Sequence, residues 1–178
     1  MGQNIVSQVT GTGTNLYANY TGGTLKASAA LSTVVPATSA AITVTSTLFG
    51  PIDNPGAADD FIGGLTMDTN GFAVTHGAAL LGVTGNGIKQ ANMTITPGSG
   101  YIGAPLVTFT GGTGTPASGY AVISGGAVTG IVITSPGDYT VDPTGVTLTG
   151  GGGTGASVAL TALTANPTDS GLTKINSG

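Results

Sequence analysis

The stretch ITPGSGYIGAPLVTFTGGTGTPA at residues 95–117 returns, altered but recognisable, as ITSPGDYTVDPTGVTLTGGGGTGA at residues 133–156. Ile95, Tyr101 and Pro105 of the first copy match residues of the second copy at one constant separation (133 − 95 = 38). A unit that recurs with its turns and its apolar alternation intact is a supersecondary building block, stacked or paired with its neighbour. The repeat therefore predicts an all-β protein, either a repetitive β-solenoid or a stacked β-hairpin array, with negligible helix.

Within both copies, single apolar residues stand between threonines. Phe109 lies between Thr108 and Thr110, and Leu148 occupies the equivalent place in the second copy. Because alternate side chains of a strand point to opposite faces, we expect Phe109 and Leu148 to face a core and the threonines to face outward.

Further strand signals run along most of the chain. Asn70-Gly71 is the best candidate for a hairpin turn, and only residues 56–62 and 78–81 have the composition of a helical turn. Strands are expected, from their β-branched content and flanking turn residues, at residues 5–10, 41–48, 72–75, 93–96, 106–110, 120–124, 128–134, 146–149 and 157–163.

The spacing of these signals suggests three regions. Residues 1–90 have longer and more irregular connections, whereas residues 91–163 contain the two repeats. Residues 164–178 resemble the start of a further, truncated repeat.

Composition limits the function. The chain has 178 residues, 6% of them charged, with three lysines, no arginine and a formal net charge of −4. Such a chain cannot build the basic surface that nucleic-acid binding requires. It has no cysteine, so it offers no disulfide, thiolate nucleophile or thiolate metal site. It also lacks an apolar run long enough to cross a bilayer, and we expect no membrane insertion.

Three short motifs carry a resemblance to a known family. They are YTGGTL at residues 20–25, LTMDTNGF at residues 65–72 and SGLTKINSG at residues 170–178. Together with the GSGYIGAP and PGDYTVDP units of the repeats, they resemble the passenger regions of very large bacterial autotransporter-like surface proteins. This resemblance implies a right-handed parallel β-solenoid outside the cell, without catalysis in the repeat region. It also implies that the chain is an internal fragment of a larger protein.

Few residues are candidates for chemistry. Asp53, Asp59 and Asp60 share one loop and offer hard oxygen ligands for Ca²⁺, although acidic residues beside proline and glycine are commonly turn formers. His76 is the only histidine, and we interpret it as a residue at the end of a strand. Asp138 has no acidic counterpart in the first repeat. We therefore predict no catalytic residues, no firm metal site and no cofactor.

The repeat-equivalent Tyr101 and Tyr139 allow two interpretations. Equivalent aromatic rings in an array could stack on sugar rings, which would make the protein a carbohydrate-binding module. The simpler interpretation is that each tyrosine packs on its own turn, against the following Pro105 or Pro143.

These observations favour a non-enzymatic, extracellular or cell-surface structural or adhesive module that self-associates. Leu172 and Ile175 are expected to form an exposed strand that pairs with another chain, giving a homo-oligomer or filament. An adhesive module of this kind would bind a glycan or another cell-surface partner. The alternative is a phage virion decoration or fibre protein, which would account for the start at Met1 without a signal peptide.

Overall fold

A computed structural model describes residues 14–30, 35, 42–52, 63–168 and 170–177 of the chain. These residues form two compact units. Unit 1 comprises residues 1–51, 62–83 and 167–178, and unit 2 comprises residues 52–61 and 84–166. Both units consist of β-strands, so the expected all-β class is confirmed, and one short 3-10 helix, η1 (Gln90–Asn92), is the only helical element in the described ranges.

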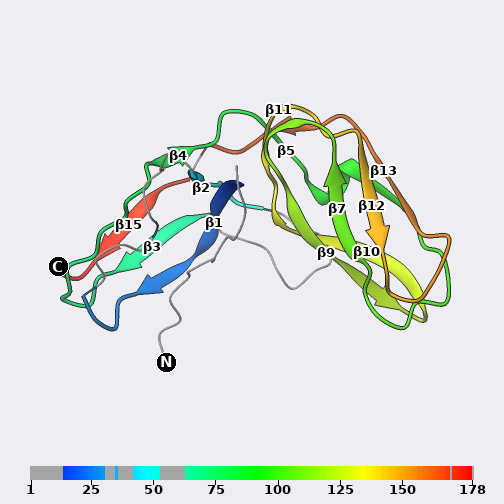
Figure 1. The fold of residues 1–178 in the computed structure, drawn as a ribbon, viewed down its shortest axis with the longest axis horizontal. Helices are drawn as coiled ribbons and strands as arrows, with labels where there is room; N and C mark the ends of the chain where they lie inside the picture. Colours follow the sequence, from blue (N-terminus) through cyan, green and yellow to red (C-terminus); the bar gives the residue numbers. More distant parts are fainter. Residues whose placement is uncertain (1–13, 31–34, 36–41, 53–62, 169, 178) are drawn as a thin grey trace. The chain divides into compact units, whose positions relative to one another are not determined.

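Unit 1 is built from five strands that run parallel to their neighbours (Figure 1). The first half of β1 pairs with β2, which pairs with β4, and the second half of β1 pairs with β3, which pairs with β15. The five strands thus make three levels, which we call the stack: level 1 is β1, level 2 is β2 with β3, and level 3 is β4 with β15. Their bounds are β1 Thr14–Lys26, β2 Ile42–Leu48, β3 Gly64–Asp68, β4 Leu80–Gly82 and β15 Leu172–Ile175.

The two halves of β1 meet at a bend between Tyr20 and Thr21. Successive carbonyl groups of a straight strand point to opposite sides. Here Tyr20 accepts from Phe49 N at 2.8 Å and Thr21 from Gly63 N at 2.9 Å, and Gly64 N donates to the Phe49 carbonyl at 2.7 Å. The end of β2 and the start of β3 therefore lie together on one side of β1. Because successive carbonyls of β1 bond to that one side, the strand changes direction here, next to a register irregularity between β1 and β3.

The second half of each level carries a related sequence. The segments GGTLK, GLTMD and GLTKI begin at residues 22, 64 and 171. The strand registers place Thr24, Thr66 and Thr173 side by side, one from each level. The three motifs that carried the family resemblance are thus adjacent strands of one sheet, although they lie far apart in the sequence.

The residues on either side of this threonine column face the interior. Leu65 and Met67 of level 2 are buried. Leu172 and Lys174 occupy the corresponding positions of level 3, where both are exposed. The interior of unit 1 is filled from the strands and from the connections between levels, through the buried residues Val35, Val44, Leu48, Leu65, Met67 and Ala78.

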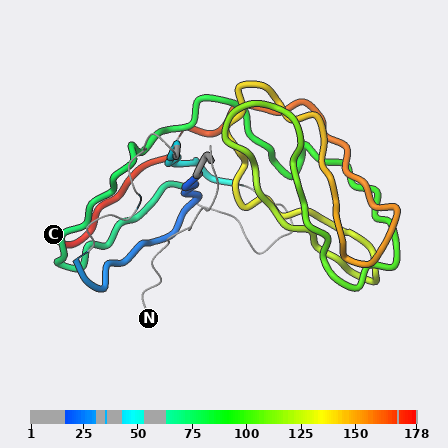
Figure 2. The backbone as a smooth tube through the Cα atoms, viewed as in Figure 1, coloured from blue at the N-terminus to red at the C-terminus, as the bar shows by residue number. Residues whose placement is uncertain are grey.

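Unit 2 is antiparallel throughout and contains three sheets, with the orders β10-β9, β14-β5-β11-β8 and β6-β13-β12-β7. Figure 2 follows the chain from β4 into this unit and back to β15. The strand bounds are β5 Asn86–Gly87, β6 Met93–Thr96, β7 Leu106–Thr110, β8 Thr113–Thr115, β9 Ser118–Ser124, β10 Ala127–Ser135, β11 Asp138–Val141, β12 Gly145–Thr149, β13 Ser157–Leu160 and β14 Thr164–Ala165.

The two sequence repeats exchange strands within unit 2. The first repeat runs through β6 and β7 and is followed by β9, and the second runs through β10 and β12 and is followed by β13. The first strand of each repeat pairs with the strand that follows the other repeat, so β6 pairs with β13 and β10 with β9. The middle strands, β7 and β12, pair with each other. The expected repeat is therefore real, but its copies interlock as antiparallel partners and are not stacked as successive levels.

The expected faces of the repeat strands are confirmed. Phe109 and Leu148 are partly buried and pack against the main core of unit 2, whereas Thr108 and Thr147 are exposed. Four residues of this core are fully buried: Ile88 comes from the segment before the repeats, Val128 and Ile131 from the segment between them, and Ile133 from the second repeat.

Three local predictions are wrong: the hairpin at Asn70-Gly71, the strand at residues 72–75 and the helical turn at residues 78–81. Asn70 and Gly71 do form a turn with positive φ values of 49° and 83°, but no hairpin results, because β3 pairs in parallel with β1 and β15 and residues 72–75 form no strand. The segment 78–81 is not helical, since Leu80–Gly82 is β4. The tight hairpin of unit 2 instead joins β9 to β10 through Gly125 and Gly126, whose φ values of 59° and 78° suit the two central positions of such a turn.

The expected region boundaries also change. Residues 164–178 do not open a further copy of the 95–156 repeat, because Leu172–Ile175 pairs with β3 and completes unit 1. Residues 84–90, assigned from the sequence to an irregular first region, belong to unit 2. The expected strand at residues 5–10 and the expected helical turn at 56–62 lie outside the described residues.

Candidate functional site

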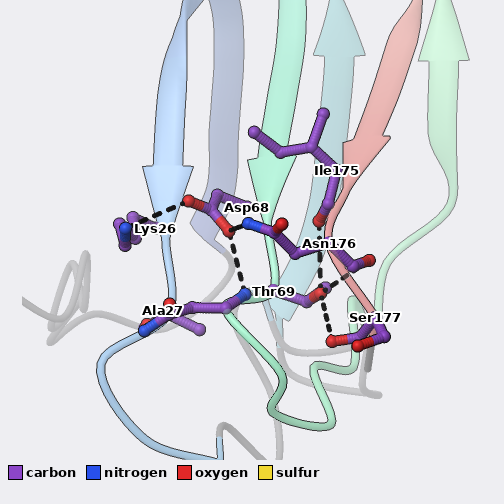
Figure 3. Close-up of polar contacts among 8 residues, drawn as sticks. Lys26, Ala27, Asp68, Thr69, Ile175, Asn176 and Ser177 are labelled. Carbon is purple, nitrogen blue, oxygen red and sulfur yellow. Dashed lines mark hydrogen bonds and ion pairs between the residues drawn. The ribbon is translucent and has the colours of Figure 1, made fainter.

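The turns that end levels 2 and 3 meet at a polar cluster, which we call the Asp68 clamp (Figure 3). Asp68 is the last residue of β3 and is buried. Its Oδ1 accepts hydrogen bonds from Asn176 Nδ2 at 2.7 Å and from Asn70 N at 2.9 Å, and Lys26 Nζ lies 3.3 Å from Oδ2. One carboxylate therefore connects all three levels at this end of the stack.

Thr69 and Asn70 add further bonds between the levels. The Thr69 hydroxyl lies 3.2–3.3 Å from the carbonyl oxygens of Ile175, Asn176 and Ser177, and its single proton can be donated to one of them at a time. Asn70 Nδ2 donates to the carbonyl of Ala27, 3.1 Å away in the turn after level 1. Each turn is thus tied to the turn of the neighbouring level.

The charge of Asp68 is stabilised by these partners. The hydrogen bond from Asn176 is the main cause that lowers the pKa of Asp68; burial opposes it, while the Asn70 amide and Lys26 lower the pKa further. An ionised carboxylate that accepts two N–H groups and faces an ammonium group is a well-satisfied structural anion. The polar groups of the clamp therefore hold neighbouring levels together.

The edge of the stack at β15 is the second candidate. The carbonyls of Gly171 and Ile175 accept hydrogen bonds from Leu65 N and Thr69 N, at 2.9 and 3.3 Å. Since alternate residues of a parallel strand turn their backbone groups to opposite sides, Leu172 and Lys174 turn theirs away from β3. Among the described residues, β15 pairs with β3 alone.

Leu172 and Ile175, the expected self-association residues, both lie on this edge strand. Leu172 is 48% exposed and Ile175 41% exposed. Their side chains are on opposite faces, because Leu172 aligns with the inward Leu65 and Ile175 aligns with Asp68. Lys174 stands between them and donates from Nζ to the carbonyl of Asn176 at 2.7 Å, which keeps its ammonium group over its own turn.

His76 belongs to a polar network in unit 1. Its Nδ1 lies 2.7 Å from the Ala78 carbonyl, which can only accept, so in the neutral ring Nδ1 carries the proton. The single lone pair of Nε2 then accepts from one hydroxyl at a time, that of Tyr20 at 3.1 Å or that of Ser46 at 3.3 Å. Burial raises the pKa of Tyr20, while its hydrogen bond with Ser46 lowers it. Because Ser46 is fully buried and the ring donates to a backbone carbonyl, this serine and histidine join the levels and do not form a nucleophile exposed to substrate.

Tyr101 and Tyr139 do not form a sugar-stacking ladder, because both rings are buried in the core of unit 2. The Tyr139 hydroxyl accepts a hydrogen bond from Ala117 N at 2.7 Å, and burial raises the pKa of Tyr139. Glycines approach both rings closely, as Gly153 does at Tyr101 and Gly137 at Tyr139. Tyr139 thus packs on Gly137 of its own turn, whereas Tyr101 packs on Gly153 of the second repeat. The expected packing of the two rings against Pro105 and Pro143 stays a prediction.

Asp138 and Asp142 are brought to one end of unit 2, where both act as acceptors inside the fold. Asp138 Oδ1 accepts from Gly85 N at 2.7 Å and from two weaker donors, and Asp142 Oδ1 accepts from Asn86 Nδ2 at 2.9 Å. The neighbouring Asn166 donates from Nδ2 to the Gly137 carbonyl at 2.8 Å. These carboxylates therefore fix the start of unit 2 to its second repeat.

The Ca²⁺ candidates Asp53, Asp59 and Asp60 lie outside the described residues. Within the described ranges, no three histidine or acidic side chains gather closely enough to hold a metal ion.

No protein-family model, curated protein or solved structure matches this chain. In the part of the chain that the structure describes, no helix has the length and apolar character needed to span a bilayer.

Sequence reasoning missed the Asp68 clamp, although a signal for it was present. The motifs GLTMDTN and GLTKINS, which start at residues 64 and 171, place an Asp or Asn within two residues of the end of a strand. If the two motifs are recognised as adjacent levels, their alignment predicts that Asp68 and Asn176 are neighbours.

Proposed function

We propose that this chain is a non-enzymatic structural or adhesive module of a cell-surface protein, and that its stack is a segment of a parallel β-solenoid. The support is the register of unit 1, in which three levels repeat the same succession of strand, bend, strand and turn. Such arrays place little chemistry in their levels and serve as extended surfaces.

The polar residues of the described chain support a structural role over a catalytic one. The carboxylates of Asp68, Asp138 and Asp142 and the ring of His76 each hold backbone or amide groups of the fold itself. The extracellular location rests on the resemblance of residues 65–72 and 170–178 to surface-protein repeats.

We further propose that the module associates with a second copy of itself, or with a further level, through the edge strand β15. The observation that carries this proposal is the edge itself, where two apolar side chains are about half exposed and the backbone groups of Leu172 and Lys174 point away from β3. An unpaired strand edge is a template for β-pairing. Lys174 opposes such pairing, and its bond to the Asn176 carbonyl leaves the edge accessible on the Leu172 side.

Sedimentation or light scattering across a hundredfold concentration range tests this association. The variant carries Leu172→Lys and Ile175→Lys, and the matched control carries Ile102→Lys and Val141→Lys, two exposed apolar positions of unit 2. The wild type and the control should assemble alike, while the edge variant should remain monomeric. A wild type that is monomeric at every concentration, or an assembly that the edge variant leaves intact, would contradict the proposal.

A further inference from the structure

Both long insertions of the stack occur at one place, the bend. Level 1 passes the bend without interruption, from Tyr20 to Thr21. Level 2 leaves β2 after Leu48, the partner of Tyr20, and resumes at Gly64, the partner of Thr21. Level 3 leaves β4 at Gly82, the partner of Leu48, and resumes in β15. The three levels therefore differ in the number of residues inserted at the bend.

The hydrogen bonds at the bend explain why the stack accepts insertions there. The ends of the level 2 insertion are joined by the bond from Gly64 N to the Phe49 carbonyl at 2.7 Å. Both ends also bond to level 1, through Phe49 N and Gly63 N. The chain can leave and return at this point while the parallel ladder on each side remains paired.

Unit 2 has the features of a domain inserted into another chain segment. The two ends of its long segment, residues 84–166, are adjacent, because Asn166 N donates to the Gly85 carbonyl at 3.0 Å and β14 pairs with β5. Domains with neighbouring termini and a core of their own are tolerated as insertions. Its core also contains Ile52, which comes from the level 2 insertion. Both insertions therefore contribute to one folded body.

We propose that the bend is the insertion site of this stack and that unit 2 is a guest domain carried at level 3. The bend of level 1 is then an empty site of the same kind. In this arrangement the stack is a scaffold. A different inserted domain would give the protein different binding properties without altering the strands of the stack. The proposal stands on the registers and the terminal contacts, and it does not depend on self-association.

A loop of about eight Gly and Ser residues inserted between Tyr20 and Thr21 tests the site at level 1. The matched control carries the same loop between Tyr17 and Ala18, inside the ladder that pairs with Thr45 and Ser46. Because loop closure costs little once the ends are held, the melting temperature of the bend variant should stay within about 3 °C of the parent. The control should lose more than about 10 °C or fail to fold, because the register beyond the insertion is lost. Equal losses in the two variants would overturn the proposal.

A second variant tests the guest itself. Residues 84–166 are replaced by a linker of about three residues, with Ile52→Ser added because Ile52 loses its core. A stack that keeps β-type circular dichroism and cooperative unfolding supports the inserted-domain interpretation. An unfolded product, beside a bend variant that folds, would show that unit 2 is an integral part of the stack and would overturn its assignment as a guest.

Discussion

Asn176 donates from Nδ2 to Asp68 Oδ1 at 2.7 Å, joining the turn of level 3 to the end of β3 across 108 positions of sequence. Replacing Asn176 by glycine removes the amide and keeps a residue that tolerates its φ of 62°. We expect a lower denaturation midpoint for unit 1. In a double-mutant cycle with Asp68→Ala the combined loss should be smaller than the sum of the two single losses, because each substitution removes the same bond. Fully additive losses would show that the contact contributes nothing.

Because the Asp68 carboxylate is ionised in the fold, we expect acid to lower the stability of the stack. The pKa of Asp68 is lowered in the fold, so its contribution to stability is present above the unfolded pKa of about 3.9 and is lost as pH falls through the lower folded value. Unfolding of the wild type, followed from pH 5 to pH 2, should show a falling midpoint. The Asp68→Asn variant should start from a lower midpoint and show a shallower fall, and an unchanged slope would contradict the assignment.

The faces of the repeat strands predict unequal costs of substitution. Phe109→Ala should lower the free energy of unfolding by about 2 kcal/mol or more, because it leaves a void beside the core of unit 2. Thr108→Ala, on the exposed face of the same strand, should cost less than about 1 kcal/mol. Chemical denaturation of the two variants is the measurement, and similar values would mean that the faces are misassigned.

Replacing Gly64 by alanine should produce a steric clash at the bend. Its φ is +68°, and an added Cβ would lie 2.6 Å from the Gly171 carbonyl oxygen. Gly23 also has a positive φ, but a Cβ there meets nothing within 4 Å. Both alanine variants carry backbone strain of about 1 kcal/mol, and only Gly64→Ala adds the clash. Its melting temperature should therefore fall well below that of Gly23→Ala, and a fall of equal size would argue against close packing at the bend.

Removal of metal ions should leave the protein folded. The sequence offers no cysteine, one histidine and only a loop of three aspartates as a candidate Ca²⁺ site. The melting temperature in excess EDTA should match that in buffer. A drop of more than about 5 °C would make the loop containing Asp53, Asp59 and Asp60 a metal site, because a ligand that binds the folded state raises its stability.

The strands of unit 2 could be predicted from sequence because their signals are local. Leu106–Thr110 and Met93–Thr96 were predicted with their observed bounds, since β-branched alternation and flanking turn residues mark them. The interlocking of the repeats was not predicted, because alternation fixes which face a residue occupies and not which strand it pairs with.

The stack was harder to predict. Its levels recur at unequal separations, from residue 22 to 64 and from 64 to 171 (64 − 22 = 42 and 171 − 64 = 107), since the insertions interrupt the period. The bonds of the Asp68 clamp depend on this long-range pairing, so only the recognition of GLTMDTN and GLTKINS as adjacent levels could indicate them. The one histidine was expected at the end of a strand, but residues 72–75 form no strand, and its partners Tyr20 and Ser46 lie on β1 and β2.

The contact between Gly85 and Asn166 has a consequence for how the protein folds. The two strands of level 3 are separated by a long segment, and bringing the ends of an unfolded loop together costs more entropy as the loop lengthens. Once unit 2 has folded, its ends are already held by a hydrogen bond, and the effective loop shrinks to a few residues. We therefore expect unit 2 to fold first and β15 to dock last, so that a lesion in the core of unit 2 slows completion of the stack without touching any of its strands.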